Sequence, residues 1–412
     1  MSQKAKEDKA QPPRPTVRKR WESEFETSES EANAAPEVKP LKARLASFRT
    51  RFITTIIMIL GFIGIIAAGH LYCCVLVLFI NTCIFKEIVS LKRSEHRDQK
   101  LPFFFLINWY FFGLTEGFTV MTFMKNRFLN LGYEFIWLTY RYGYLIIFIL
   151  YVLGIVLFVI SLRKGQYRYQ FNMFAWTHIT CLLVVTQSSA VIDNIYNGLI
   201  WFLLPASLVI VNDSFAYVFG VFFGRTPLIR ISPNKTWEGF IGGFVCTIVW
   251  ACLFSNFLSG YSFFVCPQEE LTFEPFKYIE CDASDLVLRY SRALPEVFSY
   301  VGLTQINASS MEIHAIVLGF FAGFIAPFGG FFASGVKRAF KIKDFGDSIP
   351  GHGGMTDRMD CQLMMGMFTC VWLNSVVLKQ VPSVQSVLNQ ISGLSLDEQH
   401  QILRELQRKI SN

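Results

Sequence analysis

One stretch of the sequence combines acidic, basic and glycine residues in a way that suits phosphate chemistry. It runs from Ser334 to Asp360 and holds five Lys or Arg, four Asp and one His in 27 residues. Asp357 and Asp360 are three residues apart, so they share one face of a helix. Two carboxylates placed in this way suit Mg²⁺, which keeps some of its waters and is bridged by substrate phosphates. The spacing predicts a metal-assisted polyphosphate site.

The same stretch supplies cations and permissive backbone around the two carboxylates. The cations that could neutralise a polyphosphate are Lys337, Arg338, Lys343 and Arg358. Gly353 and Gly354 follow His352 and permit a close backbone approach that side chains would block. A solvated loop with salt bridges is the alternative for any one of these residues, but it does not account for the whole set.

A second candidate is Asp213, which stands midway along an otherwise apolar run. A carboxylate there costs roughly 2.5–3.5 kcal/mol on insertion into a membrane, so such a residue is a functional-site candidate. Asp213, Tyr217 and Gly220 share one helix face. The alternative is a neutral Asp that is hydrogen-bonded within a helix bundle.

The turn that follows also carries polar residues. Ser232-Pro233 predicts a helix start, with Ser232 as the cap. Asn234, Lys235 and Thr236 would then present backbone N–H groups, a cation and a hydroxyl to a phosphate. An interfacial membrane anchor explains this turn equally well, because basic and Trp residues mark membrane boundaries.

The composition predicts the elements that must position these residues. The chain is 52% hydrophobic and 17% charged and contains 42 Phe, whereas soluble domains carry about a quarter charged residues. A spanning helix needs about 20 mostly apolar residues. The sequence therefore predicts an all-α polytopic membrane protein with about nine transmembrane helices, at 52–69, 71–89, 102–124, 142–162, 172–190, 197–222, 239–260, 314–333 and 362–379.

The charge pattern divides the chain and orients it. Residues 1–51 hold 12 Lys or Arg and 8 Asp or Glu with little apolar clustering, which predicts a disordered, basic, cytosolic tail. The N-terminal transmembrane helices occupy 52–190 and the catalytic transmembrane region 197–379. Four of the linkers are rich in Lys and Arg and fall on the cytosolic side of a nine-helix count, as the positive-inside rule expects. The C-terminal residues 380–412 predict an amphipathic helix that begins with a capping box at Ser395.

The same count puts an insert at 261–313 in the lumen. It contains Cys266, Cys281 and the glycosylation sequon at Asn307. An oxidising compartment could pair the two cysteines. The other eight cysteines lie mostly in apolar stretches without metal-ligand spacing, so we interpret them as buried and unpaired.

The run from Ser334 through Lys337-Arg338, Lys343-Asp344 and His352-Gly353-Gly354 to Asp360 resembles the signature of the CDP-diacylglycerol synthases, also called phosphatidate cytidylyltransferases. The stretches 213–217 and 232–239 resemble two further landmarks of that family. The layout, with a basic tail and a lumenal insert, resembles the eukaryotic, fungal-type members.

This resemblance implies a Mg²⁺-dependent transfer, CTP + phosphatidate → CDP-diacylglycerol + diphosphate, at the cytosolic face of the endoplasmic-reticulum membrane. Asp357 and Asp360 would hold the metal, and Ser334, Lys337 and Arg338 would contact substrate phosphates. Where bacterial members have a further acidic ligand this chain has Gly330, so Asp213, Asp344 or water would complete the shell. A second, monovalent cation and a homodimer are further expectations from the family.

Three other functions compete with this prediction. A CTP-dependent lipid kinase would move the γ-phosphate to a lipid alcohol and would need a base. A transporter would use Asp213 as part of an ion path, but the sequence has no internal repeat and its charge lies in loops. A lipid-regulatory scaffold would need no catalysis. We expect membrane lipids and the two substrates as partners, and no nucleic acid. For His352 we expect a role in positioning a phosphate or donating a proton, not in nucleophilic attack.

Overall fold

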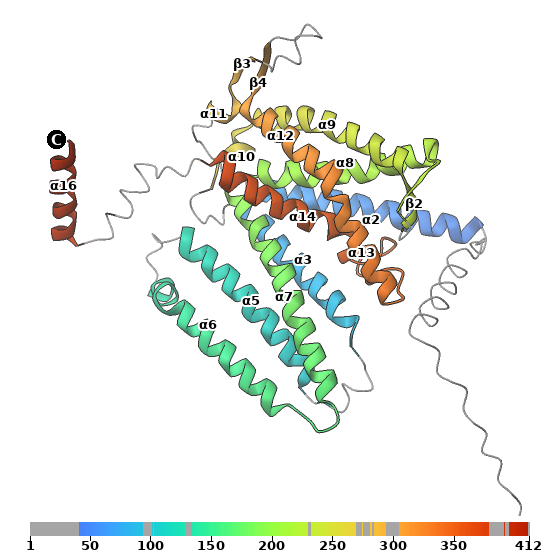
Figure 1. Cartoon of the computed structure of the whole chain (residues 1–412), viewed down its shortest axis with the longest axis horizontal. Coiled ribbons are helices and arrows are strands. Elements are labelled where there is room, and N and C mark those ends of the chain that lie inside the picture. The colour runs from blue at the N-terminus through green and yellow to red at the C-terminus, as the bar shows by residue number, and fades with distance from the viewer. Residues whose placement is uncertain are drawn as a thin grey trace, which may run out of the picture. The chain divides into compact units, whose positions relative to one another are not determined.

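The computed structural model describes residues 41–93, 101, 103–127, 134–229, 232–268, 274, 281, 284–293, 305–378, 391 and 395–410. The chain divides into two compact units, residues 1–53 and 54–412. Helices dominate the described part (Figure 1). The long helices are α2 (Leu41–Ala68), α3 (His70–Ser90), α5 (Phe104–Arg127), α6 (Glu134–Ile160), α7 (Tyr167–Tyr196), α8 (Ile200–Phe223), α9 (Trp237–Ser259), α12 (Ser310–Phe320), α13 (Pro327–Ala339), α14 (Thr356–Trp372) and α16 (Leu396–Ile410).

Short elements connect or interrupt these helices. Two π-helical turns, η2 (Phe321–Ile325) and η3 (Leu373–Val377), continue α12 and α14. The remaining elements are the short helices α10 (Ser262–Val265) and α11 (Ser284–Val287), and two antiparallel hairpins made of β1 (Pro227–Ile229) with β2 (Ser232–Thr236) and β3 (Arg289–Ala293) with β4 (Gln305–Ser309).

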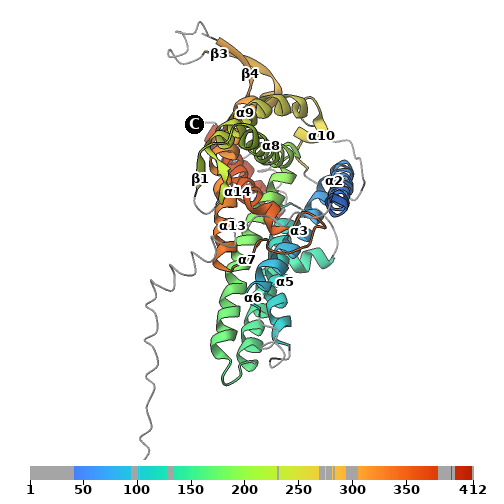
Figure 2. The same ribbon diagram turned by 90° about the vertical axis from the view of Figure 1, so that its right-hand side faces the viewer.

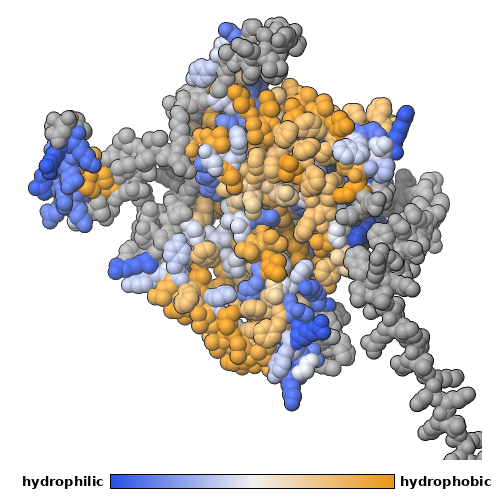
Figure 3. Space-filling model, in the orientation of Figure 1, coloured by the Kyte–Doolittle hydropathy of each residue, from blue (hydrophilic) through white to orange (hydrophobic). Residues whose placement is uncertain are grey.

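Six of the described helical segments are long and apolar enough to cross a membrane. They are His70–Ser90, Arg141–Ile160, Tyr167–Tyr196, Ile200–Phe223, Trp237–Ser259 and Ser310–Ala339. Apolar side chains cover much of the helix surface that faces the viewer in Figure 3. In a soluble protein such a surface would be buried, so the chain is a polytopic, mainly helical membrane protein.

One group of helices, α3, α5, α6 and α7, packs through aromatic side chains. Phe85 of α3 stacks on Phe112 of α5, with ring centroids 4.2 Å apart. Phe158 of α6 lies 4.4 Å from Phe174 of α7. The outer face of α6 stays exposed over most of its length, as expected for a helix that faces lipid. These helices bring the end of α3 next to the loop that precedes α14.

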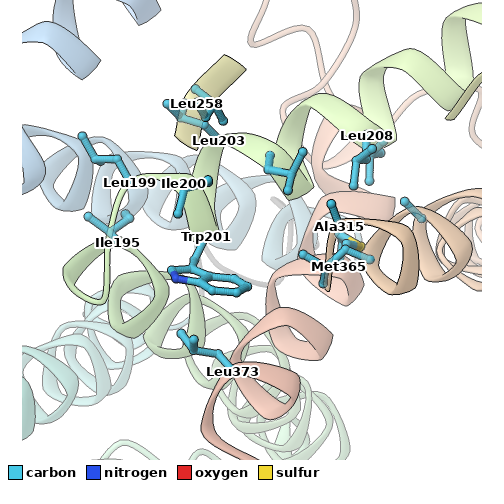
Figure 4. Packing of buried hydrophobic residues seen from close by; sticks show 14 of the residues in the cluster. Ile195, Leu199, Ile200, Trp201, Leu203, Leu208, Leu258, Ala315, Met365 and Leu373 are labelled. Atoms are coloured by element: carbon cyan, nitrogen blue, oxygen red, sulfur yellow. The ribbon is translucent and has the colours of Figure 1, made fainter. Parts of the chain in front are cut away.

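A second group of helices carries the polar residues predicted to do chemistry. Its core surrounds Trp201 of α8, with Leu199, Leu258, Met365 and Leu373 nearby (Figure 4). Helices α8 and α9 lie side by side in both ribbon views (Figures 1 and 2). Gly239 makes this approach possible, because a Cβ there would lie 2.5 Å from the carbonyl oxygen of Ala216. Close packing of α8 and α9 fixes the position of the polar face of α8.

The described part of the insert between α9 and α12 contains α10, α11 and hairpin β3–β4. Hairpin β3–β4 projects beyond the ends of α9 and α12 (Figures 1 and 2). A disulfide joins Cys266 to Cys281, which confirms the pairing that the sequence left open. Asn307 of β4 is exposed, and Ser309 of the same sequon caps α12 by accepting a hydrogen bond from the Glu312 N–H.

Helices are present near both ends of the chain. Helix α2 begins at Leu41, so residues 41–51 are helical, and residues 1–40 of the predicted tail lie outside the described residues. The predicted C-terminal amphipathic helix is confirmed as α16. The N–H and hydroxyl of Ser395 donate to the Glu398 carboxylate and hold the pKa of that carboxyl below its usual range.

Candidate active site

The polar residues of the signature lie on α13, on the loop 340–355 and on the first turn of α14. One face of α13 is buried, including Gly330 and Phe331, and its last turn carries Lys337 and Arg338. Helix α14 packs against both α13 and α8. This arrangement brings the Ser334–Asp360 stretch next to Asp213.

Asp357 forms the centre of the loop's hydrogen bonding. Its Oδ1 accepts from the Lys337 Nζ at 2.6 Å, and the two side chains are only 6% and 18% exposed. Its Oδ2 accepts from the backbone N–H of Phe345 at 2.8 Å and of Gly354 at 3.3 Å. Breaking a buried ion pair of this kind costs about 3–5 kcal/mol. Asp357 therefore ties α13, the loop and α14 together.

Asp360, Asp213 and Lys235 form a second cluster, in which Asp360 and Lys235 lie beside the backbone of Gly330. A Cβ placed on Gly330 would meet the Asp360 Oδ2 at 3.4 Å and the Lys235 Nζ at 3.5 Å. Asp213 interacts electrostatically with Lys235, Asp360 and Arg358, and its side chain is exposed. The Lys235 Nζ also lies 4.5 Å from the centre of the Phe331 ring. Gly330 thus lets the backbone of α13 pass close to Asp360 and Lys235.

Hairpin β1–β2 delivers Lys235 to this cluster. The prediction that a helix starts at Ser232-Pro233 is wrong, because Ser232–Thr236 forms β2 and α9 begins at Trp237. The physical reason is the pairing of β2 with β1, after which the Thr236 hydroxyl caps α9 by accepting from the Gly239 N–H. Glu238 then holds the hairpin, since its carboxylate accepts from the Thr226 hydroxyl at 2.7 Å and from two backbone N–H groups.

The side chain of Asn234 lies outside the described part of the structure. Ser232 is partly buried in β2, and the Thr236 hydroxyl serves as the cap of α9. Of the residues predicted in this turn, Lys235 is therefore the one whose side chain the structure places at the acidic cluster.

The glycine-rich loop is held by its own backbone and by one arginine. The Arg358 guanidinium donates two hydrogen bonds to the His352 carbonyl oxygen, at 2.8 and 3.2 Å. The His352 Nε2 lies 3.2 Å from the Thr55 hydroxyl. Gly353 has a φ of +82°, which an L side chain rarely adopts. His352 is thus held in place by α2 on one side and Arg358 on the other.

The remaining predicted residues lie around the edge of this region. Ser334 is partly buried on α13, and Arg338, Lys343 and Asp344 are exposed. A Cβ on Gly353 would lie 3.5 Å from Asp344, so this carboxylate stands beside the loop. Arg338 and Lys343 thus add exposed positive charge to this region, which suits a polyphosphate.

The residues present suit a divalent metal that relies on its substrate for ligands. Within the described ranges, no three His, Cys, Asp or Glu side chains gather closely enough to hold a metal alone. Asp213 and Asp360 supply two carboxylates, and Mg²⁺ binds through one or two carboxylates, waters and substrate phosphates. The predicted set of four Asp ligands is not gathered in one place, because Asp357 is occupied by Lys337 and two N–H groups and Asp344 lies beside Gly353.

Glu87 is a buried carboxylate at this site that the sequence interpretation did not single out. It lies near the end of α3 and is 4% exposed. Its carboxylate accepts from the Ser348 hydroxyl and from the backbone N–H groups of Met355 and Thr356. An acidic residue within an apolar span was the available signal, but its position near the span's end made it resemble an ordinary boundary charge.

The structure therefore places a cluster of acidic and basic side chains, beside a glycine-containing loop, among the helices of a membrane protein. Such a cluster suits the binding of phosphate groups. The profile of the cytidylyltransferase family matches residues 49–376 of the chain. Three curated relatives extend this match over most of the sequence.

Phosphatidate cytidylyltransferase 1 of Arabidopsis thaliana is 42% identical over 401 residues, which cover 94% of this chain and 93% of the relative. Phosphatidate cytidylyltransferase 2 of Homo sapiens is 42% identical and covers 91% and 86%. A putative phosphatidate cytidylyltransferase of Schizosaccharomyces pombe is 40% identical and covers 88% and 83%. The chain therefore belongs to the phosphatidate cytidylyltransferase family.

Proposed function

We propose that the protein transfers the cytidylyl group of CTP to phosphatidate, which yields CDP-diacylglycerol and diphosphate. The observation that carries this proposal is the cluster of Asp360, Asp213 and Lys235, in which Asp360 lies on the same helix as Asp357 of the Lys337–Asp357 pair. The named activity of the relatives supports the choice of substrates.

The chemistry places few demands on a general base. The phosphate oxygen of phosphatidate is already anionic at neutral pH and forms the new bond to the α-phosphorus of CTP. The bond between the α- and β-phosphates breaks, and diphosphate leaves. Two anions must be held in line against their repulsion, so the protein contributes mainly positioning and charge neutralisation.

The cations of the site divide this work between them. Lys235 reaches the acidic cluster from β2 and is placed to pair with a phosphate there. Arg338 and Lys343 are exposed and are free to meet the incoming triphosphate, with Ser334 on the same helix as Arg338. Lys337, paired with Asp357, stabilises charge on the leaving diphosphate.

Mg²⁺ is the metal that this site would take, held by Asp360 and Asp213 with water and phosphate oxygens in the remaining positions. It would neutralise phosphate charge and polarise the α-phosphate. Asp357, Asp344 and a monovalent cation remain candidates to complete the site when both substrates are bound. His352, Gly353 and Gly354 would line the phosphate side of the loop, and Arg358 would keep the loop closed.

We further propose nine membrane crossings, with the catalytic face in the cytosol of an endoplasmic-reticulum membrane. Segments that contact one another must lie on the same side of the bilayer. The end of α3 contacts the loop before α14 through Glu87, and the end of α7 contacts the insert through the Gln268 N–H and the Tyr196 carbonyl at 2.9 Å. Both contacts join segments on the same side of the bilayer when α2, α5 and α14 are counted as crossings in addition to the six segments named above. The disulfide supports a lumenal insert.

The proposed topology also accounts for the access of both substrates. Phosphatidate would arrive laterally between helices while CTP arrives from the basic cytosolic face. A homodimer completes the proposal.

The test follows label from CTP into lipid. Purified protein in detergent is given phosphatidate and CTP labelled at the α-phosphate, with Mg²⁺ or with EDTA. Label in the lipid phase that depends on Mg²⁺ and is lost in Asp360→Ala supports the proposal. Lipid labelled from γ-labelled CTP instead would show a lipid kinase. Folded protein that labels no lipid would exclude both enzymes.

A further inference from the structure

Glu87 joins a helix outside the signature to the centre of the site. Its Oε1 accepts from the Ser348 hydroxyl and from the Met355 N–H at 2.8 Å, and its Oε2 accepts from the Thr356 N–H at 2.8 Å. These donors all belong to the loop and to the first turn of α14, more than 250 residues away in sequence.

Helix α14 depends on this carboxylate for its start. The first N–H groups of a helix have no partner within the helix and are usually satisfied by a capping side chain. Met355, the residue at the cap position of α14, provides no such hydrogen bond. Glu87 provides it from α3, and its negative charge interacts favourably with the helix dipole.

The loop is held between Glu87 and Asp357. A Cβ on Gly354 would lie 2.8 Å from the Glu87 Oε2 and 3.0 Å from the Asp357 Oδ2. A Cβ on Gly346 would lie 3.1 Å from Glu87. Glycine therefore stands where the backbone passes between the two carboxylates. Gly354 thus lies between Glu87 and Asp357, and Asp357 pairs with Lys337.

We propose that Glu87 is a positioning residue for cytidylyl transfer, which sets the geometry of Asp357 and Lys337 through the backbone of the loop. The inference rests on the proposed function for its catalytic readout. It also makes a structural claim, because Glu87 is the acceptor that protects the amides of Met355 and Thr356 from exchange.

The experiment compares Glu87→Gln and Glu87→Asp with the wild-type protein. Glutamine keeps the size of the side chain but turns an NH₂ donor toward N–H or O–H donors, so at least one of the three hydrogen bonds is lost. Aspartate keeps the acceptor chemistry and is one methylene shorter. Glu116→Gln is the matched control, because it neutralises another carboxyl of the same helix group, which accepts a hydrogen bond from the Asn81 amide instead of from the loop.

We expect Glu87→Gln to lower kcat about 100-fold, since a misplacement of about 1 Å can cost that much. We expect KM for CTP and for phosphatidate to change by less than about threefold, because the lost interaction acts in the transition state. Glu87→Asp should recover about tenfold of the lost kcat. Hydrogen exchange should be faster at residues 354–356 in the glutamine variant and unchanged there in Glu116→Gln.

Several results would overturn the inference. Wild-type kcat in Glu87→Gln would do so, and so would a lower kcat with unchanged exchange at 354–356. If the glutamine variant does not fold, the aspartate variant provides the test. A kcat and an exchange rate in Glu87→Asp that both equal those of the wild type would refute a geometric role. If the wild-type protein transfers no cytidylyl group, the proposed function fails, and the exchange measurement alone still tests the contact of Glu87.

Discussion

Replacement of Gly354 by alanine tests the claim that the loop is fixed between two carboxylates. The new Cβ would lie 2.8 Å from the Glu87 Oε2, 2.9 Å from the Gly346 N and 3.0 Å from the Asp357 Oδ2. Ordinary contact begins at 3.4 Å. These groups must therefore retreat by roughly 0.4–0.6 Å, in a tightly packed place where overpacking costs about 1–3 kcal/mol.

The movement matters because Asp357 holds Lys337 at 2.6 Å and Asp360 lies on the same helix face. A shift of about half an ångström at Asp357 should lower kcat by about 10–100-fold, judged from the sensitivity of reactions to orientation. The assay measures α-label transfer from CTP to phosphatidate at saturating Mg²⁺, alongside the thermal midpoint of the detergent-solubilised protein.

Gly335→Ala is the matched control, because it makes the same chemical change within the same signature. Nothing lies within 4 Å of a Cβ at Gly335, and alanine is favoured over glycine in a helix by about 1 kcal/mol. The control should keep wild-type kcat and should not lower the thermal midpoint. Equal activities in Gly354→Ala and Gly335→Ala would refute the reasoning.

Three further outcomes are expected. Asp360→Asn should raise the Mg²⁺ concentration for half-maximal activity by at least about tenfold, because one of two nearby carboxylates is lost. A Mg²⁺ titration of the activity measures this, and an unchanged titration would contradict the metal assignment. Glu238→Gln should raise KM for CTP and lower the thermal midpoint slightly, because the Thr226 hydroxyl and two N–H groups lose a carboxylate partner. A wild-type KM would show that the hairpin is not part of the CTP site. Cys266→Ser should lower the free energy of unfolding by about 3 kcal/mol, since the disulfide closes a loop with a sequence separation of 15. It should also free the thiol of Cys281, which thiol labelling without reductant detects. Labelling of both cysteines in the wild-type protein would refute the disulfide.

The general architecture follows from the sequence alone. A chain with 52% hydrophobic residues in runs of about 20 has to place them in lipid, where helices satisfy the backbone. Six of the expected segments form helices of sufficient length and hydropathy. The pairing of Cys266 with Cys281 was anticipated as an option because both cysteines fall in one polar insert. The signature around Asp357 and Asp360 is recognisable from the sequence because acidic, basic and glycine residues stand there at the spacing of the family.

The start of α9 shows where local patterns were insufficient. Ser232-Pro233 and Thr236 are both acceptable helix starts by local chemistry. Strand pairing with Pro227–Ile229, together with the grip of Glu238 on Thr226, decides in favour of Thr236. Those contacts come from residues outside the local window, so a helix-start pattern could not anticipate them.

Tertiary structure alone decided how the site is divided between its carboxylates. The spacing of Asp357 and Asp360 predicts a shared face but not their partners. In the fold, Asp357 accepts hydrogen bonds from Lys337 and two backbone N–H groups. Asp360 lies in the cluster with Asp213 and Lys235. The fold also brings Glu87 to the loop from a helix more than 250 residues earlier. The partner of a buried charge depends on which helices pack together, and no short sequence pattern contains that information.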